Sequence, residues 1–166
     1  MPFTNLAAIG VCTAVAAGSW NMPPPAPVAD IPPDYIAAYQ AAAPACPGLD
    51  WTTLAAIGKA ETDHGREAGT AAHSGENSAG AAGPLQFLQP TFTEVQQAHP
   101  DVAGDRYDVT ASTHAAAHYL CDNGASRGDL RGAIYAYNPT QAYVDHVLRQ
   151  ADAYRAAAQD ANEGRS

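Results

Sequence analysis

Positive charge is scarce in this chain of 166 residues. Eight Lys and Arg stand against seventeen Asp and Glu, which gives a formal net charge of −9, and the first cation is Lys59. Nucleic-acid binding depends on Lys and Arg that neutralise phosphates, so the composition argues against a nucleic-acid partner. An anionic ligand would have to gain its affinity from hydrogen bonds and stacking rather than from long-range attraction.

Bulky aromatic residues are also few. The chain has three Phe and two Trp, and Ala dominates the 46% of residues that are apolar. Sheets of a sandwich favour branched and aromatic side chains, whereas Ala-rich segments favour closely packed helices. The length suits one domain with one core. We therefore predict a mainly α single domain.

The N-terminal part lacks both cations and a long apolar run. Residues 6–17 are apolar, a length that suits the core of a signal peptide and is too short for a membrane span. Ala14, Val15 and Ala16 offer a cleavage site of the A-x-A type, although no Lys or Arg precedes the run. We expect 1–20 to be a signal peptide or short anchor, and the protein to be exported, extracytoplasmic or cell-wall associated.

Proline and glycine divide the rest of the chain. Six prolines lie between residues 23 and 33 and favour polyproline II, which predicts a linker at 21–31. A folded domain is expected at 32–158, followed by a polar tail at 159–166. Helical periodicity and breaking Pro or Gly residues, with Asp50 and Asp108 as N-caps, predict helices at 34–43, 51–64, 90–99, 108–120, 129–137 and 140–158. Residues 65–85 show no such period, and a long irregular segment of this kind is usually functional.

Only three cysteines occur: Cys12, Cys46 and Cys121. Cys12 lies in the N-terminal stretch, which leaves an even pair in the domain. No CxxC or Cys/His cluster surrounds that pair, so we expect no zinc site. A bridge between Cys46 and Cys121 would close a loop of about 75 residues and contribute about 4 kcal/mol of stability. The alternative is two separate buried thiols.

The most informative residue is Glu61. Leu54, Ile57, Gly58 and Glu61 follow one another at helical spacing, which places the carboxyl group on an apolar stripe. Burial there would raise its pKa toward the range that a general acid needs. A structural glutamate paired with a buried donor such as Arg would show the same pattern, so the stripe alone leaves both interpretations open.

Three segments around this residue form a recognisable set. IGKAETDHG at 57–65 is followed by GAAGPLQFLQPTF at 80–92 and GAIYAYN at 132–138. Together they resemble the soluble lytic transglycosylases of the lysozyme superfamily, and the segment before Trp51 looks like actinobacterial members. The resemblance spans about 31–154 and implies a lysozyme-like domain whose irregular segment forms one side of a glycan groove.

The resemblance also implies roles for single residues. Glu61 matches the catalytic acid/base, and Thr62 stands where the family usually has Ser, so a hydroxyl next to the acid is kept. Gln86 matches a glutamine that lines the groove and contacts the sugar. Tyr137 and Asn138 match a pair near the catalytic carboxyl, where the tyrosine is expected to donate a hydrogen bond to Glu61. The resemblance thus implies that Thr62, Gln86, Tyr137 and Asn138 bind the substrate.

The implied reaction cleaves the bond between N-acetylmuramic acid and N-acetylglucosamine in peptidoglycan and leaves 1,6-anhydro ends. It needs no metal or organic cofactor, and the expected partner is a peptidoglycan glycan strand bound by a monomer. One alternative is a hydrolytic muramidase that uses a second carboxylate from Glu67, Glu76 or Asp105. A less favoured one is a wall-binding protein without activity.

Histidines suggest two further roles that we consider weaker. His114 and His118 have the spacing of a helical zinc pair, but no third ligand is evident and no metal is expected. His64 and His73 flank the irregular segment, where a contact with substrate is one interpretation, and we interpret them instead as exposed loop residues.

Overall fold

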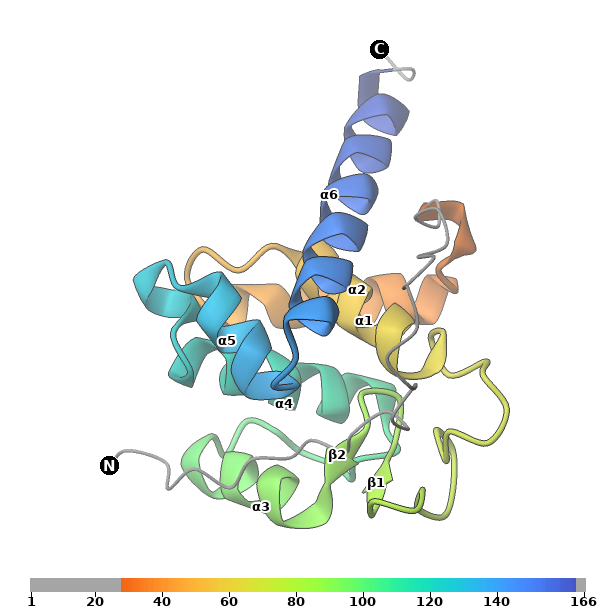
Figure 1. Ribbon diagram of the computed structural model, residues 1–166, viewed down its shortest axis with the longest axis vertical. Coiled ribbons are helices and arrows are strands. Elements are labelled where there is room, and N and C mark those ends of the chain that lie inside the picture. The colour runs from red at the N-terminus through yellow and green to blue at the C-terminus, as the bar shows by residue number, and fades with distance from the viewer. Residues whose placement is uncertain (1–27, 164–166) are drawn as a thin grey trace.

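The computed structural model describes residues 28–163, and most of this part of the chain is helical, as predicted (Figure 1). Its α-helices are α1 (Pro33–Ala42), α2 (Trp51–Thr62), α3 (Gln89–Ala98), α4 (Val109–Asp122), α5 (Leu130–Tyr137) and α6 (Gln141–Glu163). Short 3-10 turns lie at η1 (Val28–Asp30), η2 (Ala43–Ala45) and η3 (Ala125–Arg127), and two strands at β1 (Ala81–Ala82) and β2 (Phe87–Leu88).

Aspartates begin three of the helices. Asp50, Asp108 and Asp129 precede α2, α4 and α5, and each accepts a hydrogen bond of 2.7–2.9 Å from a backbone N–H of the first turn. Such a cap satisfies one of the N–H groups that a helix start leaves without a partner. The predicted caps at Asp50 and Asp108 are therefore confirmed.

Helix α2 occupies the middle of the domain. It packs against α6 and α1 and also touches α4, and nine of its twelve residues are buried. A helix that is apolar nearly all round can be buried on several sides at once. Leu54 and Ile57 are fully buried, and Glu61 in the last turn is only 3% exposed. The expected inward stripe is thus present.

The end of α2 differs from the prediction. The helix stops at Thr62 rather than near His64, because Asp63 and His64 both adopt left-handed backbone conformations, with φ of 50° and 54°. The N–H of His64 reaches back to the carbonyl of Gly58 at 3.0 Å, which closes the helix in the manner of a C-terminal capping motif.

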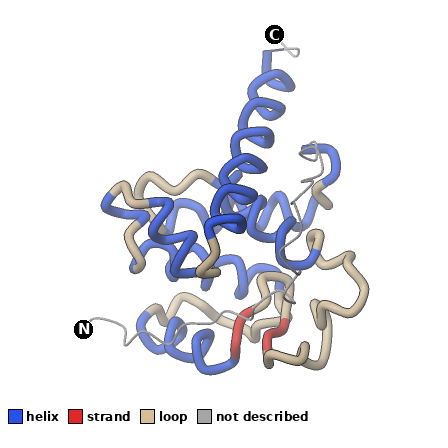
Figure 2. The backbone as a smooth tube through the Cα atoms, viewed as in Figure 1, coloured by secondary structure: helices blue, strands red, loops and turns tan. Residues whose placement is uncertain are grey.

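The irregular segment leads from α2 to a small hairpin. Strands β1 and β2 are antiparallel, with Ala81 opposite Leu88 and Ala82 opposite Phe87. Figure 2 shows the long loop before β1 running outside the helices. At the turn of the hairpin, a Cβ on Gly83 would lie 1.7 Å from the carbonyl oxygen of Arg106, so only glycine fits there.

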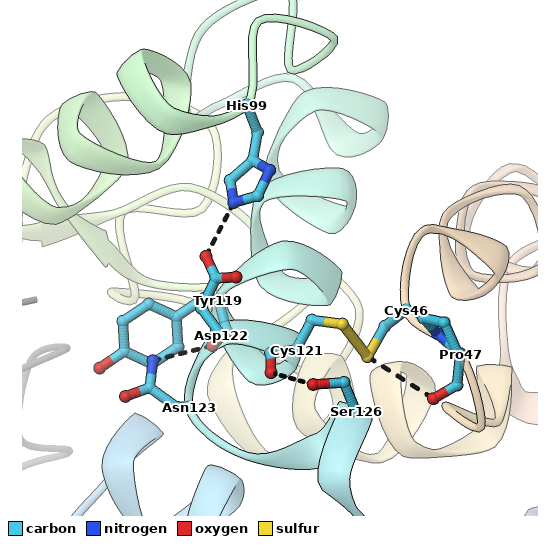
Figure 3. The surroundings of a disulfide bond; sticks show 8 residues. All are labelled: Cys46, Pro47, His99, Tyr119, Cys121, Asp122, Asn123 and Ser126. Carbon is cyan, nitrogen blue, oxygen red and sulfur yellow. Dashed lines mark hydrogen bonds and ion pairs between the residues drawn. A yellow bond between two sulfur atoms is a disulfide. The ribbon is translucent and has the colours of Figure 1, made fainter. Parts of the chain in front are cut away.

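A disulfide joins Cys46, just after η2, to Cys121 in the last turn of α4 (Figure 3). The two residues are 75 positions apart in sequence, and their Cα atoms are 5.3 Å apart. The predicted bridge is therefore confirmed, whereas Cys12 lies outside the described residues.

The folded region extends further at both ends than the 32–158 expected from sequence. Ile31 is 4% exposed, and Asp30 pairs with Lys59 at 2.7 Å and with Arg66 at 3.1 Å, so residues 28–31 belong to the fold. Helix α6 continues to Glu163, and its C-terminal half extends beyond the other helices (Figure 1).

The expected signal peptide at 1–20 and most of the 21–31 linker lie outside the described residues. In the part of the chain that is described, no helix combines the length and the apolar character that a membrane span requires.

Candidate active site

The carboxyl group of Glu61 lies at the interface of α2 and α6. The hydroxyl of Tyr143, in the first turn of α6, donates a hydrogen bond of 2.6 Å to Oε1 of Glu61. Tyr143 is 9% exposed and Glu61 is 3% exposed, so the bond is buried. Burial disfavours the charged carboxylate, whereas a donated hydrogen bond favours it. The geometry thus provides a carboxyl group held in one orientation by a donor from a distant helix.

Tyr137 lies close to Glu61 but bonds elsewhere. Its hydroxyl donates to the carbonyl of Leu85 at 2.8 Å, and the side chain is fully buried. Burial first, and then the nearby charge of Glu61, raise the pKa of Tyr137 well above its usual value. The expected tyrosine donor to Glu61 exists, but it is Tyr143 rather than Tyr137, since the single hydroxyl proton of Tyr137 is directed at Leu85.

Thr62, next to the acid, has an internal role. Its hydroxyl donates to the carbonyl of Pro84 at 2.8 Å and accepts from the N–H of Gly65 at 2.8 Å. The residue is fully buried. Because its only proton is used on Pro84, Thr62 cannot donate to Glu61. It connects the end of α2 to the hairpin turn.

Gln86 is likewise buried, at 3% exposure, and adopts a left-handed backbone with φ of 52°. Its amide nitrogen donates to the carbonyls of Thr70 and of Gly83, the latter at 2.9 Å. Its amide oxygen accepts from the side chain of Asn77 at 3.0 Å. Both donors of Gln86 are therefore used within the protein, and they tie the irregular segment to the hairpin turn.

Three residues that sequence alone assigned to substrate thus meet at one turn, Gly83–Gln86. Thr62 bonds Pro84, Tyr137 bonds Leu85, and Gln86 bonds the carbonyl at the start of the same turn. The turn follows β1 and precedes β2, and it contacts the end of α2 where the carboxyl group lies. These side chains position the polypeptide beside Glu61.

Asn138 ends α5 and shapes the connection to α6. It is 6% exposed; its backbone carbonyl accepts from the N–H of Thr140 at 2.8 Å, and its side-chain oxygen accepts from the Thr140 hydroxyl at 3.5 Å. Thr140 in turn accepts from the N–H of Tyr143 at 3.2 Å. Asn138 therefore belongs to the turn that brings Tyr143 to Glu61.

The other carboxylates of the irregular region have different surroundings. Glu76 forms an ion pair with Arg106, which is 4% exposed and also donates to two backbone carbonyls of the hairpin region. Asp105 accepts from two backbone N–H groups at 2.9 and 3.1 Å and so stabilises its own turn. Glu67 is exposed to solvent. Arg106 had no local sequence signal, because its partners lie 19 to 30 residues away.

The interpretation of His64 as an exposed loop residue is wrong. It is 1% exposed and lies between Tyr39 and Tyr154, whose hydroxyls are 2.9 Å from Nδ1 and 3.1 Å from Nε2. Burial is the main cause that lowers the pKa of His64 to about 4, with Arg66 and Lys59 adding to it. His73, by contrast, is exposed as expected, 2.8 Å from the carbonyl of Gly65.

Fold and site together define a class: a small α-helical domain of lysozyme type, with one buried carboxyl group at the end of its central helix. The family model described as Transglycosylase SLT domain matches residues 38–159, and the chain belongs to this family. It is therefore a lytic transglycosylase domain that acts on peptidoglycan. Searches of curated proteins and of solved structures found no match.

Proposed function

We propose that this chain cleaves the β-1,4 bond between N-acetylmuramic acid and N-acetylglucosamine, with Glu61 as the only acid and base and a 1,6-anhydro ring as the product. The observation that carries the proposal is the buried carboxyl group of Glu61, held at 2.6 Å by Tyr143 at the α2–α6 interface. The muramidase and wall-binding alternatives make different predictions for the experiments below.

In the first step the protonated Glu61 gives its proton to the glycosidic oxygen, and the bond from that oxygen to C1 of the muramyl residue breaks. The leaving chain departs with a new hydroxyl group, and positive charge develops on the muramyl ring. Burial of Glu61 supports this role because it disfavours the carboxylate before reaction.

In the second step the carboxylate of Glu61 removes the proton from the muramyl 6-hydroxyl, whose oxygen bonds to C1. Glu61 is protonated again, and no water is consumed. Tyr143 stabilises the carboxylate between the two steps, because a hydrogen bond to a charged acceptor is stronger than one to the neutral acid. The tyrosine thus acts most strongly after proton transfer.

The surroundings of the other carboxylates support a single-carboxyl mechanism. A hydrolase of this type needs a second carboxylate that activates water. Glu76 forms an ion pair with the buried Arg106, and the carboxylate of Asp105 accepts hydrogen bonds from backbone N–H groups of its turn. All three carboxylates are exposed, but Glu67 has no ion pair among the described residues, so it is the residue on which the muramidase alternative depends.

The substrate and the disulfide also support a location of the protein outside the cytoplasm. Peptidoglycan lies outside the membrane, and a structural disulfide such as Cys46–Cys121 persists in an oxidising compartment. We propose an exported protein that binds a glycan strand as a monomer, without metal in the catalytic step. The hairpin turn and the irregular segment would form one wall of the glycan groove.

The central test replaces Glu61 with Gln and compares it with Glu67→Gln. Glu61→Gln should abolish the clearing of purified cell walls, since an amide cannot donate and recover the proton, while circular dichroism and chitooligosaccharide binding stay close to wild type. Glu67→Gln should lyse walls normally. Retained lysis in Glu61→Gln would remove this residue from the mechanism, and loss in Glu67→Gln would favour the muramidase.

The product distinguishes the two reactions directly. Muropeptides from digested walls should end in 1,6-anhydro-N-acetylmuramic acid, lighter by one water than hydrolysed ends and resistant to borohydride reduction. Mass spectrometry before and after reduction measures both properties. Mainly reducible ends would establish hydrolysis instead, and no new ends at all would favour the wall-binding alternative.

A further inference from the structure

Two histidines and two aspartates meet where the end of α3 packs on α4. His99 follows the last residue of α3, and Asp101 lies in the next turn of chain. His118 and Asp122 are one helical turn apart on α4. Figure 3 shows His99 bonded to Asp122, beside Cys121 of the disulfide. This cluster lies outside the contacts described for Glu61.

The contacts within the cluster are close. Nε2 of His99 is 2.7 Å from a carboxylate oxygen of Asp122, and Nε2 of His118 is 2.8 Å from one of Asp101. The two imidazole rings stack with centroids 3.9 Å apart and an interplanar angle of 17°. Among the described residues, His99, Asp101 and His118 each offer a ligand atom, and these atoms lie within 4.8 Å of one another.

Local structure holds the cluster in place. Pro100 prevents α3 from continuing, and the N–H of Val102 bonds the carbonyl of His99 at 3.0 Å, which folds the chain back. The side chain of Gln96 donates to the carbonyls of Val102 and Gly104 at 3.1 and 2.8 Å, so this turn is fastened to α3. On the other side, His118 and Asp122 share one face of α4 because they are four residues apart.

We propose that His99, Asp101 and His118 bind a divalent transition-metal ion of the zinc class. Imidazole nitrogens and a carboxylate oxygen are ligands that zinc accepts, and three protein ligands leave one position for water. The inference is independent of the glycan reaction. It departs from the sequence expectation of no metal, which considered only His114 as a partner for His118.

Asp122 orients the site without binding the ion. An ionised carboxylate only accepts hydrogen bonds, so the proton between Asp122 and His99 belongs to Nε2 of His99, and the lone pair is on Nδ1. Carboxylates commonly hold metal-binding histidines in this way. At His118 the metal replaces the Nε2 proton, which is released to solvent.

Binding requires two adjustments. The stacked rings lie in nearly parallel planes, and an imidazole lone pair lies in the plane of its ring, so one ring has to turn about its Cβ–Cγ bond before both nitrogens face the same ion. Two ligand atoms of a tetrahedral zinc ion, each about 2.1 Å from the metal, lie about 3.4 Å apart. His118 and Asp101 therefore have to separate by about 0.6 Å. The side chain of Asp101 is 59% exposed and can move, whereas that of His118 is 11% exposed. The exposed side of Asp101 also gives the ion its path from solvent.

The test titrates tag-free, chelator-treated protein with Zn²⁺ in a calorimeter and with Co²⁺ in a spectrophotometer. We expect one ion per chain, visible d–d absorption of bound Co²⁺, and a thermal midpoint that rises with zinc. Asp101→Asn and His118→Gln should weaken binding by at least about tenfold, and Asp122→Asn by about 10- to 100-fold. The matched control His73→Gln, at an exposed histidine outside the cluster, should bind as wild type does.

Because Asp101 is exposed, Asp101→Asn keeps the fold and tests the site even if His118→Gln unfolds. Absence of saturable binding below about 1 mM zinc would overturn the proposal. So would equal affinity in wild type and Asp101→Asn, or loss of binding in His73→Gln alone, which would place the ion elsewhere.

Discussion

Acid should destabilise this domain through one buried histidine. His64 is 1% exposed between Tyr39 and Tyr154, and its pKa is lowered from 6.5 to about 4. Burial raises the pKa of Tyr39 and of Tyr154, so both hydroxyl groups stay protonated at neutral pH. The neutral ring donates one hydrogen bond and accepts another. A protonated ring would have to donate both, without contact with water.

The direction and the size of this change in stability with pH follow from proton linkage. Below pH 6.5 the unfolded chain takes up a proton at this residue, and the folded chain does not until about pH 4. The stability that neutral His64 contributes is therefore fully present above pH 6.5 and is lost as the pH falls to about 4. A difference of about 2.5 pKa units corresponds to about 3 kcal/mol. Total domain stabilities are about 5–15 kcal/mol, so this loss is large.

The assay compares urea unfolding of wild type, His64→Gln and His73→Gln at several pH values between 7.5 and 4. His64→Gln should be less stable than wild type at pH 7.5, yet it should lose about 3 kcal/mol less on acidification. His73→Gln should follow wild type. The lowered pKa of His146 acts in the same direction in all three proteins and cancels.

Several aspartates also have lowered pKa values, including Asp30 and Asp63 near His64. Their contribution is lost as the pH falls through and below 3.8, the unfolded value, so it lies mainly outside the window measured here. Parallel pH curves for wild type and His64→Gln would refute the buried neutral histidine. They would mean that the ring is protonated in the folded state or is reached by water.

Three further predictions concern residues that the structure brings together. Tyr143→Phe should slow wall lysis about 10- to 100-fold without changing the circular dichroism, because it removes a hydrogen-bond donor to Glu61, the carboxylate that we propose as the acid and base. A rate within twofold of wild type would contradict this. Gly58→Ala should reduce stability by about 1–3 kcal/mol, since its Cβ would lie 1.9 Å from the hydroxyl oxygen of Tyr39, and adding Tyr39→Phe should recover part of the loss in a double-mutant cycle. Replacing Cys46 and Cys121 by Ala should lower the unfolding free energy by about 2–4 kcal/mol, and an unchanged denaturation midpoint would show that the bridge is dispensable.

The helices were predictable because their signals are local. Asp50 and Asp108 cap helix starts within three residues of their partners, and Pro100 ends a helix by its own geometry. The inward position of Glu61 also follows from spacing within one helix. The disulfide was predictable for a different reason, since only two cysteines remain in the domain.

The residues that sequence reasoning missed act over long distances. Tyr143 lies 82 residues after Glu61, and the partners of Arg106 lie 19 to 30 residues before it. The spacing of apolar residues along the sequence does not predict such a contact. His64 was misjudged because it stands beside a flexible-looking segment, while the left-handed end of α2 turns its ring into the core.

The distinction between local signals and long-range contacts also explains the positions of the residues in the sequence motifs. Thr62, Gln86 and Tyr137 come from three parts of the chain, and each bonds a backbone carbonyl of the turn 83–86. A turn carries no sequence signal for its distant supports, yet its position beside Glu61 depends on all three. A carboxyl group that must both give and recover a proton needs the reacting atoms placed within a fraction of an ångström. We therefore expect the side chains that fix this turn to contribute to the proposed reaction through its position, and their substitution should lower the turnover rate more than the affinity for glycan.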